Sequence, residues 1–195
     1  MADPDRCAPL PADIATPRLI LRALAPAVDA ALSGDIQEAS RRLGAHIPDD
    51  LLEDPHVLTL ARDRLLADSG YVPWSPRAVI LAERNTMIGH IGFHSAPDPA
   101  YLHPFCRDAV EVGYTVFEAH RRQGYAREAL AAIMAWASTE CGVGNFVASV
   151  SPENLASLGL IRGFQFAKVG SHIDELDGPE DIFLRRLEPS TLTAC

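Results

Sequence analysis

The stretch Glu111-Val-Gly-Tyr-Thr-Val-Phe-Glu-Ala-His-Arg-Arg-Gln-Gly-Tyr-Ala-Arg-Glu-Ala-Leu130 contains the change of hydrophobic period that decides the fold. It begins as a strand, continues through a glycine-containing turn rich in cationic side chains, and ends in the first turns of an amphipathic helix. A helix that starts here presents unpaired backbone N–H groups at the positive end of its dipole. The pattern predicts a phosphate-binding turn at Gly124, and an ordinary tight turn with a solvated basic edge is the alternative.

The periods on either side of this stretch predict a mixed sheet with helices on its faces, an α/β (α+β) architecture. The predicted strands span residues 18–24, 78–82, 88–94, 109–116, 145–150, 164–169 and 182–187. The predicted helices fill much of 26–70, including 55–67 with Leu66 on its buried side, and then span 126–141 and 155–162. Residues 1–15, with three prolines, are interpreted as a flexible N-terminal arm, and residues 16–195 as a single domain.

The composition narrows the class of protein. The 195 residues are 48% hydrophobic and 22% charged, and the net charge is 17 − 26 = −9, which disfavours a nucleic-acid-binding protein. Such a charge is compatible with a cationic substrate. The four cysteines, which show no zinc-binding spacing, suit a reducing compartment, and no apolar run is long enough to span a membrane. We therefore expect a cytoplasmic protein.

Family signatures sharpen the interpretation of the turn, which contains neither a P-loop nor a dinucleotide-binding motif. Arg121-Arg-Gln-Gly-Tyr-Ala126 resembles the [Q/R]-x-x-G-x-[G/A] signature of the GNAT N-acetyltransferases. Four further segments resemble the Rim-type subgroup, the ribosomal-protein alanine N-acetyltransferases. They are Thr16-Pro-Arg-Leu-Ile-Leu-Arg22, Ile88-Gly-His-Ile-Gly-Phe93, Glu111-Val-Gly-Tyr114 and Ser151-Pro-Glu-Asn-Leu-Ala-Ser157. The resemblance covers about residues 16–187.

The resemblance implies the GNAT fold, whose mostly antiparallel central sheet is flanked by helices and splays between its fourth and fifth strands. It also implies acetyl-CoA as co-substrate and no metal. The pyrophosphate would be bound by Arg121, Arg122, Gln123, Gly124, Tyr125, Ala126 and Arg127. Main-chain groups of Thr115, Val116 and Phe117 would pair with the pantetheine arm, Asn154 would hydrogen-bond to it, and Ser157 would face its thiol end. A simple helix N-cap is the alternative role of Asn154, and the two roles can coexist.

The chain departs from the family pattern after the helix predicted at 155–162. Family members have a Gly-Phe pair there, and this chain reads Arg162-Gly-Phe-Gln-Phe166. Gly163-Phe164 is that pair if the helix is two residues short. Otherwise Gln165-Phe166 occupies the place and the glycine is lost, which the following sequence favours.

N-acetyl transfer requires a base for the amine proton, a donor for the developing oxyanion and an acid for the leaving thiolate. Glu111 is the candidate base, with a strand carboxylate that pairs with a neighbouring arginine as the alternative. The family's helix tyrosine is replaced by Ile161, so Ser157 is the candidate acid, with Tyr114 as a second possibility on the opposite face of the strand from Glu111. The backbone N–H of Val116 is the expected oxyanion donor.

Two histidines, two tryptophans and one Pro-rich segment are further candidates that no motif assigns to the site. His90 and His94 share one strand face, where they could line an acceptor pocket or remain partly exposed strand residues, and they do not form a metal site. Trp74 and Trp136 are predicted to be packing residues. The Pro-rich segment 95–108 is either a lid or a flexible connection.

These observations predict an N-acetyltransferase that moves an acetyl group from acetyl-CoA to a primary amine by direct attack in a ternary complex. The acceptor would be a protein N-terminus or a small amine, and a homodimer is possible. A longer donor such as succinyl-CoA, or a non-catalytic acyl-CoA-binding module, are the alternatives.

Overall fold

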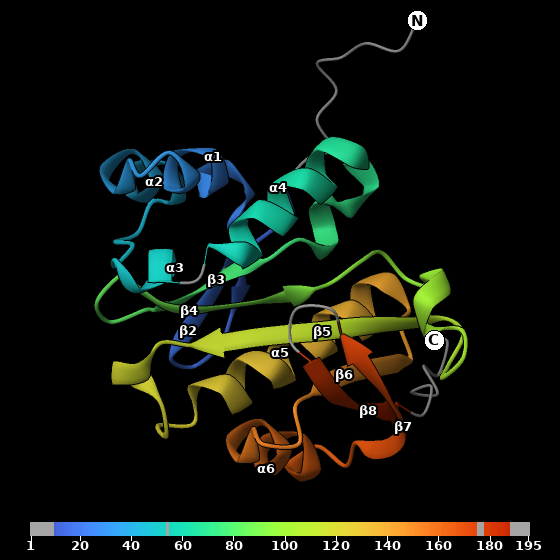
Figure 1. Ribbon diagram of the computed structural model, residues 1–195. Helices are drawn as coiled ribbons and strands as arrows, with labels where there is room; N and C mark the ends of the chain where they lie inside the picture. The colour runs from blue at the N-terminus through green and yellow to red at the C-terminus, as the bar shows by residue number, and fades with distance from the viewer. Residues whose placement is uncertain (1–9, 54, 175–177, 188–195) are drawn as a thin grey trace, which may run out of the picture. The chain divides into compact units, whose positions relative to one another are not determined.

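The computed structural model describes residues 10–53, 55–174 and 178–187 (Figure 1). The chain divides into two compact units, which are described separately. Unit 1 comprises Met1–Ala96 and Tyr114–Ile133, and unit 2 comprises Pro97–Gly113 and Met134–Cys195. Strand β5 (Ala109–Val116) and helix α5 (Tyr125–Cys141) each contribute residues to both units.

Unit 1 contains the first four strands, which pair antiparallel in chain order. They are β1 (Ile14–Ala15), β2 (Leu19–Ala23), β3 (Arg77–Leu81) and β4 (Thr86–Phe93). In β2, Leu19, Leu21 and Ala23 are buried while the residues between them are partly exposed, as the alternating pattern predicts. Of the predicted arm 1–15, residues 1–9 lie outside the described residues, and its last two residues form β1.

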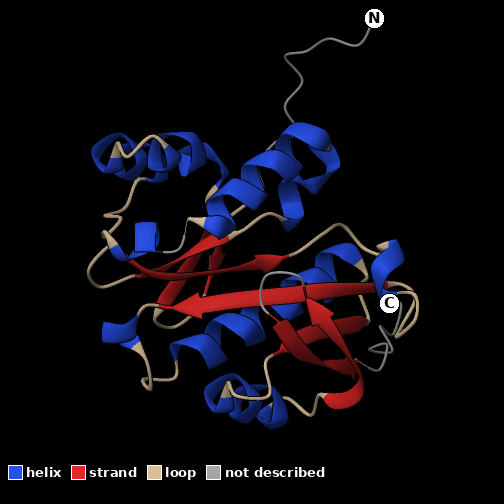
Figure 2. Ribbon diagram, in the orientation of Figure 1, coloured by secondary structure: helices blue, strands red, loops and turns tan. Residues whose placement is uncertain are grey.

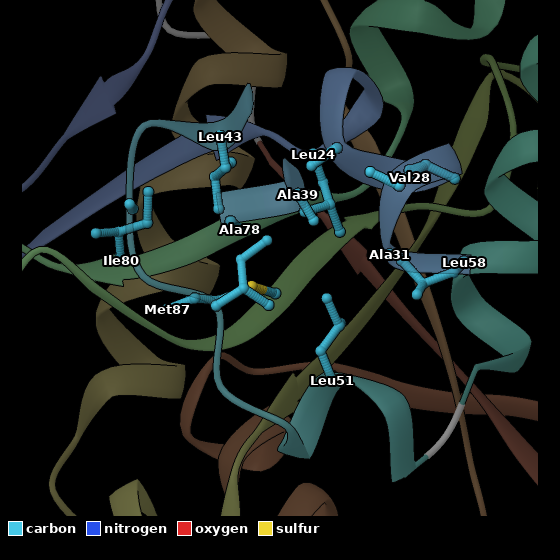
Figure 3. Close-up of a cluster of buried hydrophobic side chains, with 14 of the residues drawn as sticks. Leu24, Val28, Ala31, Ala39, Leu43, Leu51, Leu58, Ala78, Ile80 and Met87 are labelled. Carbon is cyan, nitrogen blue, oxygen red and sulfur yellow. The ribbon is translucent and has the colours of Figure 1, made fainter. Parts of the chain in front are cut away.

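Helices of unit 1 pack against β3 and β4 and enclose a hydrophobic core (Figures 1 and 3). Their bounds are η1 (Ala25–Ala27), α1 (Val28–Leu32), α2 (Ile36–Leu43), α3 (Asp50–Glu53), α4 (His56–Ala67) and η2 (Ser69–Trp74). Figure 3 shows Val28, Leu43 and Leu58 from the helices in one cluster with Ala78, Ile80 and Met87 from the strands, together with Leu24, which directly precedes η1. The expectation for Leu66 was wrong. Its side chain is 80% exposed, because α4 buries only the stripe that contains Leu58 and Ala61.

Gly89 is required by the close approach of β4 to the end of β5. A Cβ atom built on Gly89 would lie 2.1 Å from the carbonyl oxygen of Thr115. The N–H of Phe117 donates to the carbonyl of Ile88 at 2.9 Å, which fixes the end of β5 against β4. The residues that lead into the turn at Gly124 are therefore positioned by backbone contact within unit 1.

Unit 2 contains the first part of β5 together with β6 (Asn145–Val150), α6 (Leu155–Gly163), β7 (Ala167–Asp174) and β8 (Gly178–Arg186). Strands β5 and β6 are parallel, whereas β6–β8 and β7–β8 are antiparallel. The β5–β6 pairing ends at Glu111 and Val147, although both strands continue beyond these residues, and this is the predicted splay. The strand order of the described residues is β1-β2-β3-β4-β5-β6-β8-β7, so the prediction of a mixed, mostly antiparallel sheet flanked by helices is confirmed (Figure 2).

The predicted strand at 164–169 was placed too early. Helix α6 continues to Gly163, and its last turn is closed by hydrogen bonds from Gln165 N to Arg162 O and from Phe166 N to Ile161 O. Gln165 has a left-handed backbone, with φ +62°, and Phe166 is buried. This is the geometry that usually employs glycine after a helix. Gln165-Phe166 therefore occupies the place of the Gly-Phe pair, and β7 begins only at Ala167.

The segment 97–108 is held by its own hydrogen bonds within unit 2. The carboxylate of Asp98 accepts from the backbone N–H of Asp108 at 2.9 Å and lies 3.0 Å from Nε2 of His103. These contacts hold the pKa of Asp98 below its usual value, with the hydrogen bond from Asp108 as the main cause. The short helix η3 (Ala100–Leu102) places Leu102 in a cluster with Ala109, Val147, Ile182 and Leu184. The loop thus forms part of the core of unit 2.

Candidate active site

The turn between β5 and α5 lies where the sequence predicts it. After η4 (Glu118–His120), Arg122 and Gly124 both adopt left-handed backbone conformations, with φ +61° and +82°. Helix α5 then begins at Tyr125, and its first backbone bond runs from Glu128 N to Gly124 O at 3.1 Å. Two left-handed residues within three positions bend the chain sharply and leave the start of the helix open.

The backbone N–H groups of this turn are available to a ligand. Among the residues that the structure describes, no acceptor pairs with the N–H groups of Gln123, Gly124, Tyr125 and Ala126. The first N–H groups of a helix have no partner within the helix, and its dipole makes this end positive. The arrangement suits an anionic group such as a phosphate.

The two arginines of the turn have different surroundings. Arg121 is exposed, and its Nε donates to the carbonyl of Val116 at 2.9 Å, so its side chain folds back along the end of β5. Arg122 is also exposed, and the structure gives it no ion pair with another described residue. Both residues directly precede Gln123 in the chain, so they add positive charge to the turn.

The three residues predicted to contact the pantetheine arm, Thr115, Val116 and Phe117, direct their main-chain groups to opposite edges of β5. The N–H of Phe117 is used by Ile88, and the carbonyl of Thr115 lies beside Gly89, so these main-chain groups face β4. Main-chain groups of successive strand residues point to opposite edges, and those of Val116 therefore face away from β4. Of the three residues, Val116 is the one whose N–H has the direction required of a donor to a bound ligand.

Arg18 and Glu128 join the turn to the segment before β2, and the sequence analysis assigned a role to neither. Arg18 Nη1 donates to the carbonyl of Gln123 at 3.0 Å, and Arg18 Nε donates to Glu128 Oε2 at 2.7 Å. The guanidinium also lies 4.6 Å from the ring centre of Tyr125. Burial raises the pKa of Glu128, but hydrogen bonds from Thr16 and Arg18 outweigh it and hold that pKa below its usual value.

Glu111 is a buried carboxylate in unit 2. Its side chain lies on β5, is 5% exposed, and accepts a hydrogen bond from the hydroxyl of Ser149 on β6. The hydroxyl of Ser149 is thus one partner of this carboxylate.

Asn154 and Ser157 lie in the first turn of α6, as predicted. Asn154 Oδ1 accepts from the backbone N–H of Ser157 at 3.1 Å and caps the helix. The cap engages only the side-chain oxygen, and the amide donors of this exposed residue are not part of it. Ile161 is fully buried, so the position of the family's tyrosine is occupied by a core residue.

Comparison with known proteins identifies the family. The family model for the acetyltransferase (GNAT) domain matches residues 18–166. The chain belongs to the GNAT acetyltransferase family. It is therefore an acyl-CoA-dependent acetyltransferase, and the Rim-type resemblance is consistent with the structures to which the protein is similar. The comparison with curated proteins found no matching relative.

Several solved structures share this GNAT fold. A ribosomal-protein-S5-alanine acetyltransferase from Vibrio fischeri has 15% identity and a TM-score of 0.62, with 90% of this chain and 97% of that chain covered. An acetyltransferase from Agrobacterium tumefaciens has 23% identity and a TM-score of 0.59, with 95% and 100% covered. RimL, a ribosomal L7/L12 α-N-protein acetyltransferase in complex with coenzyme A, has 19% identity and a TM-score of 0.61, with 91% and 99% covered. At these identities the likeness shows the fold alone.

Trp74, His90 and His94 of this GNAT protein lie in or next to the elements of unit 1. Trp74 packs edge-on against Phe93 with ring centres 5.4 Å apart, which confirms its predicted packing role. His90 lies in β4, and His94 follows it with its carbonyl bound by Arg64. Within the described ranges, no group of His, Cys, Asp and Glu side chains could hold a metal ion, and no helix is long and apolar enough to cross a membrane.

A charge argument could have singled out Glu128 from the sequence. Glu128 places a carboxylate one helical turn from N–H groups that are suited to phosphate, and this charge would repel the ligand unless a cation neutralised it. The sequence does not reveal that Arg18, 110 residues away, is that cation. Only the tertiary structure brings the two side chains together.

Proposed function

We propose that this acetyltransferase transfers the acetyl group of acetyl-CoA to a primary amine by direct attack in a ternary complex. The observation that carries the proposal is the row of unpaired N–H groups from Gln123 to Ala126 at the start of α5, flanked by Arg121 and Arg122. Together with Arg127, these residues would bind the pyrophosphate of CoA by hydrogen bonds and charge. When bound, acetyl-CoA supplies an activated thioester carbonyl.

The main chain of β5 would orient the acyl arm. The N–H of Val116 points away from β4 and would donate to the carbonyl oxygen of the thioester, where negative charge develops during attack. Thr115 and Phe117 would contribute mainly by holding Val116 in place, because their main-chain groups face β4. Asn154 would donate its amide to the pantetheine arm while its oxygen caps α6.

Proton transfer would be divided between two side chains. Glu111 would accept the proton of the attacking amine, directly or through a water, and Ser149 would hold its carboxylate. Ser157 would relay a proton from water to the leaving thiolate, a role that the apolar side chain of Ile161 cannot fill. Ser157 is partly exposed in the first turn of α6, which leaves its hydroxyl accessible. Ser157 would thus replace the missing tyrosine.

The acceptor would be a protein N-terminus, as the name of RimL, an α-N-protein acetyltransferase, states for that protein, or a small cationic amine that suits a chain of charge −9. The test is a panel of N-terminal peptides and small amines incubated with acetyl-CoA, with the mass of each acceptor as readout. Succinyl-CoA serves as the competing donor. An acceptor gain of one acetyl group that is lost in Glu111→Gln supports the proposal. Binding of CoA with no acetylated acceptor across the panel would contradict it.

A further inference from the structure

The side chain of Arg18 contacts the cofactor turn at several atoms. Besides its bonds to Gln123 O and Glu128 Oε2, its Nη2 lies 3.4 Å from the position that a Cβ atom would take at Gly124. Its side chain is 46% exposed, and with Tyr125 it lines a small surface pocket. Arg18 is thus seated against the outside of the turn, within unit 1.

Glu128 is held at both carboxylate oxygens by the segment before β2. Its Oε1 accepts from Thr16 Oγ1 at 2.6 Å and from Arg18 N at 2.9 Å, and its Oε2 accepts from Arg18 Nε at 2.7 Å. The Glu128 side chain is 15% exposed. This set of charge-assisted bonds fixes the position of the Arg18 guanidinium relative to the first turn of α5.

The bond to Gln123 has a geometric consequence for the neighbouring residue. The carbonyl of Gln123 and the N–H of Gly124 belong to one planar trans peptide unit, in which the oxygen and the hydrogen point in opposite directions. By holding the oxygen at 3.0 Å, Arg18 therefore sets the direction of the Gly124 N–H. That N–H is one of the unpaired donors of the turn.

The bond to Glu128 has an electrostatic consequence. Glu128 carries a negative charge in the same helical turn that would receive the pyrophosphate, and Arg18 neutralises it at 2.7 Å. Without Arg18, this carboxylate would oppose the positive potential of the helix start.

We propose that Arg18 is a positioning residue for coenzyme A, which aims the Gly124 N–H at the pyrophosphate and neutralises Glu128 without touching the ligand. The inference rests on the proposed function, because it assumes that the turn binds the pyrophosphate. It differs from the roles of Arg121 and Arg122, which would meet the phosphates with their own charge.

The test measures the dissociation constants of CoA and of 3′-dephospho-CoA by calorimetry for the wild type, Arg18→Gln, Arg18→Lys and the double variant Arg18→Gln/Glu128→Gln. We expect Arg18→Gln to weaken both ligands by the same factor, about tenfold. The double variant should recover part of this loss, because the uncompensated carboxylate is gone. The CoA affinity of Arg18→Lys should lie between those of the wild type and Arg18→Gln, since one ammonium group cannot reproduce both directed bonds.

Arg22→Gln is the matched control. Arg22 lies on β2, four residues after Arg18, pairs with Asp13 at 2.8 Å and donates to the carbonyl of Leu43 at 3.1 Å, but the structure gives it no contact with the turn among the described residues. It should lower the melting temperature about as much as Arg18→Gln and leave CoA binding unchanged.

Three results would overturn the inference. The first is unchanged CoA affinity in Arg18→Gln, and the second is an Arg18→Gln variant that loses affinity for CoA but not for 3′-dephospho-CoA. The third is an Arg22→Gln variant whose CoA affinity falls as much as that of Arg18→Gln. The second would indicate direct contact with the 3′-phosphate. If Arg18→Gln does not fold, Arg18→Lys and Glu128→Gln carry the same comparison. Failure of the wild type to bind either ligand would instead contradict the proposed function itself.

Discussion

The carboxylate of Glu111 on β5 accepts a hydrogen bond from the hydroxyl of Ser149 on β6, close to the last paired position of the two strands. This contact gives a buried acid a defined orientation where the sheet opens. We expect Glu111→Gln to lower kcat by about 100-fold, because the amide cannot accept the amine proton. Steady-state kinetics with the acceptor found in the amine panel measures this loss.

Binding of CoA should be nearly unchanged in Glu111→Gln, which separates the chemical step from affinity. Glu140→Gln, at an exposed position near the end of α5, is the control and should keep full activity. Ser149→Ala should lower kcat less than Glu111→Gln does. Full activity in Glu111→Gln would show that this carboxylate is not the base.

The left-handed backbone of Gly124 predicts two different effects of substitution. Gly124→Ala should cost about 1 kcal/mol in the free energy of unfolding, because φ +82° is strained for alanine, while the added Cβ meets only ordinary contact with Arg18. Gly124→Asp adds a negative charge at the open N–H groups and should weaken CoA binding by more than tenfold. Chemical denaturation and calorimetry measure the two quantities.

Gly34 offers a control with the same φ of +82° and no atom within 4 Å of an added Cβ. Gly34→Asp should show the strain but keep CoA affinity. If Gly124→Asp binds CoA as the wild type does, the turn is not the phosphate site.

The lowered pKa of Glu128 predicts an acid-dependent loss of stability. A carboxyl whose pKa is lower in the folded state stabilises the fold above its unfolded pKa, near 4.5, and this contribution is lost as pH falls through the folded value. The difference in unfolding free energy between wild type and Glu128→Gln should therefore be largest at neutral pH and shrink below pH 4.5. Urea denaturation from pH 7 to pH 3 measures it, and a constant difference would contradict the assignment.

The close approach of Gly89 to Thr115 predicts a severe effect of a single methyl group. Gly89→Ala places its Cβ 2.1 Å from a backbone oxygen, so β4 and the end of β5 must separate, at a cost of about 2 kcal/mol or more. Thermal unfolding measures this change. Gly159→Ala, in α6 with open space around the added Cβ, should instead be neutral or stabilising by up to about 1 kcal/mol. Similar melting temperatures for the two variants would contradict the proposed steric role.

The left-handed Gln165 predicts a stabilising substitution. Gln165→Gly should raise the free energy of unfolding by roughly 0.5–1 kcal/mol, because glycine adopts φ +62° without the strain of a Cβ. Gln165→Ala keeps the Cβ and should stay close to the wild type. Denaturant titration compares the three proteins, and an equal response of the alanine and glycine variants would rule out backbone strain as the cause.

Elements with a strong period could be predicted from the sequence. Strands β5 and β6 have the predicted bounds, and α5 begins one residue before its prediction, because each buries a regular pattern of apolar side chains. Strand β7 could not be placed in this way. Most of its side chains are exposed, and it is held by backbone pairing to β8, which leaves little pattern in its sequence. The alternation of Phe164 and Phe166 resembles a strand pattern, so the strand was predicted from residue 164, where the structure has the end of α6.

The predicted site residues show the same limit. The turn at Gly124 and the cap at Asn154 depend on neighbours within a few positions, so local sequence predicts them. The contacts of Arg18 with Glu128 and of Glu111 with Ser149 join residues that are 110 and 38 positions apart. No local rule selects such partners, and a sequence can only indicate that an isolated charge needs one.

Strand β5 and helix α5 each pass from one compact unit to the other. Neither unit is therefore encoded by one uninterrupted part of the gene. No single truncation of the chain therefore yields one complete unit without part of the other. Moving either unit into another protein would require its two segments to be joined in a new chain order.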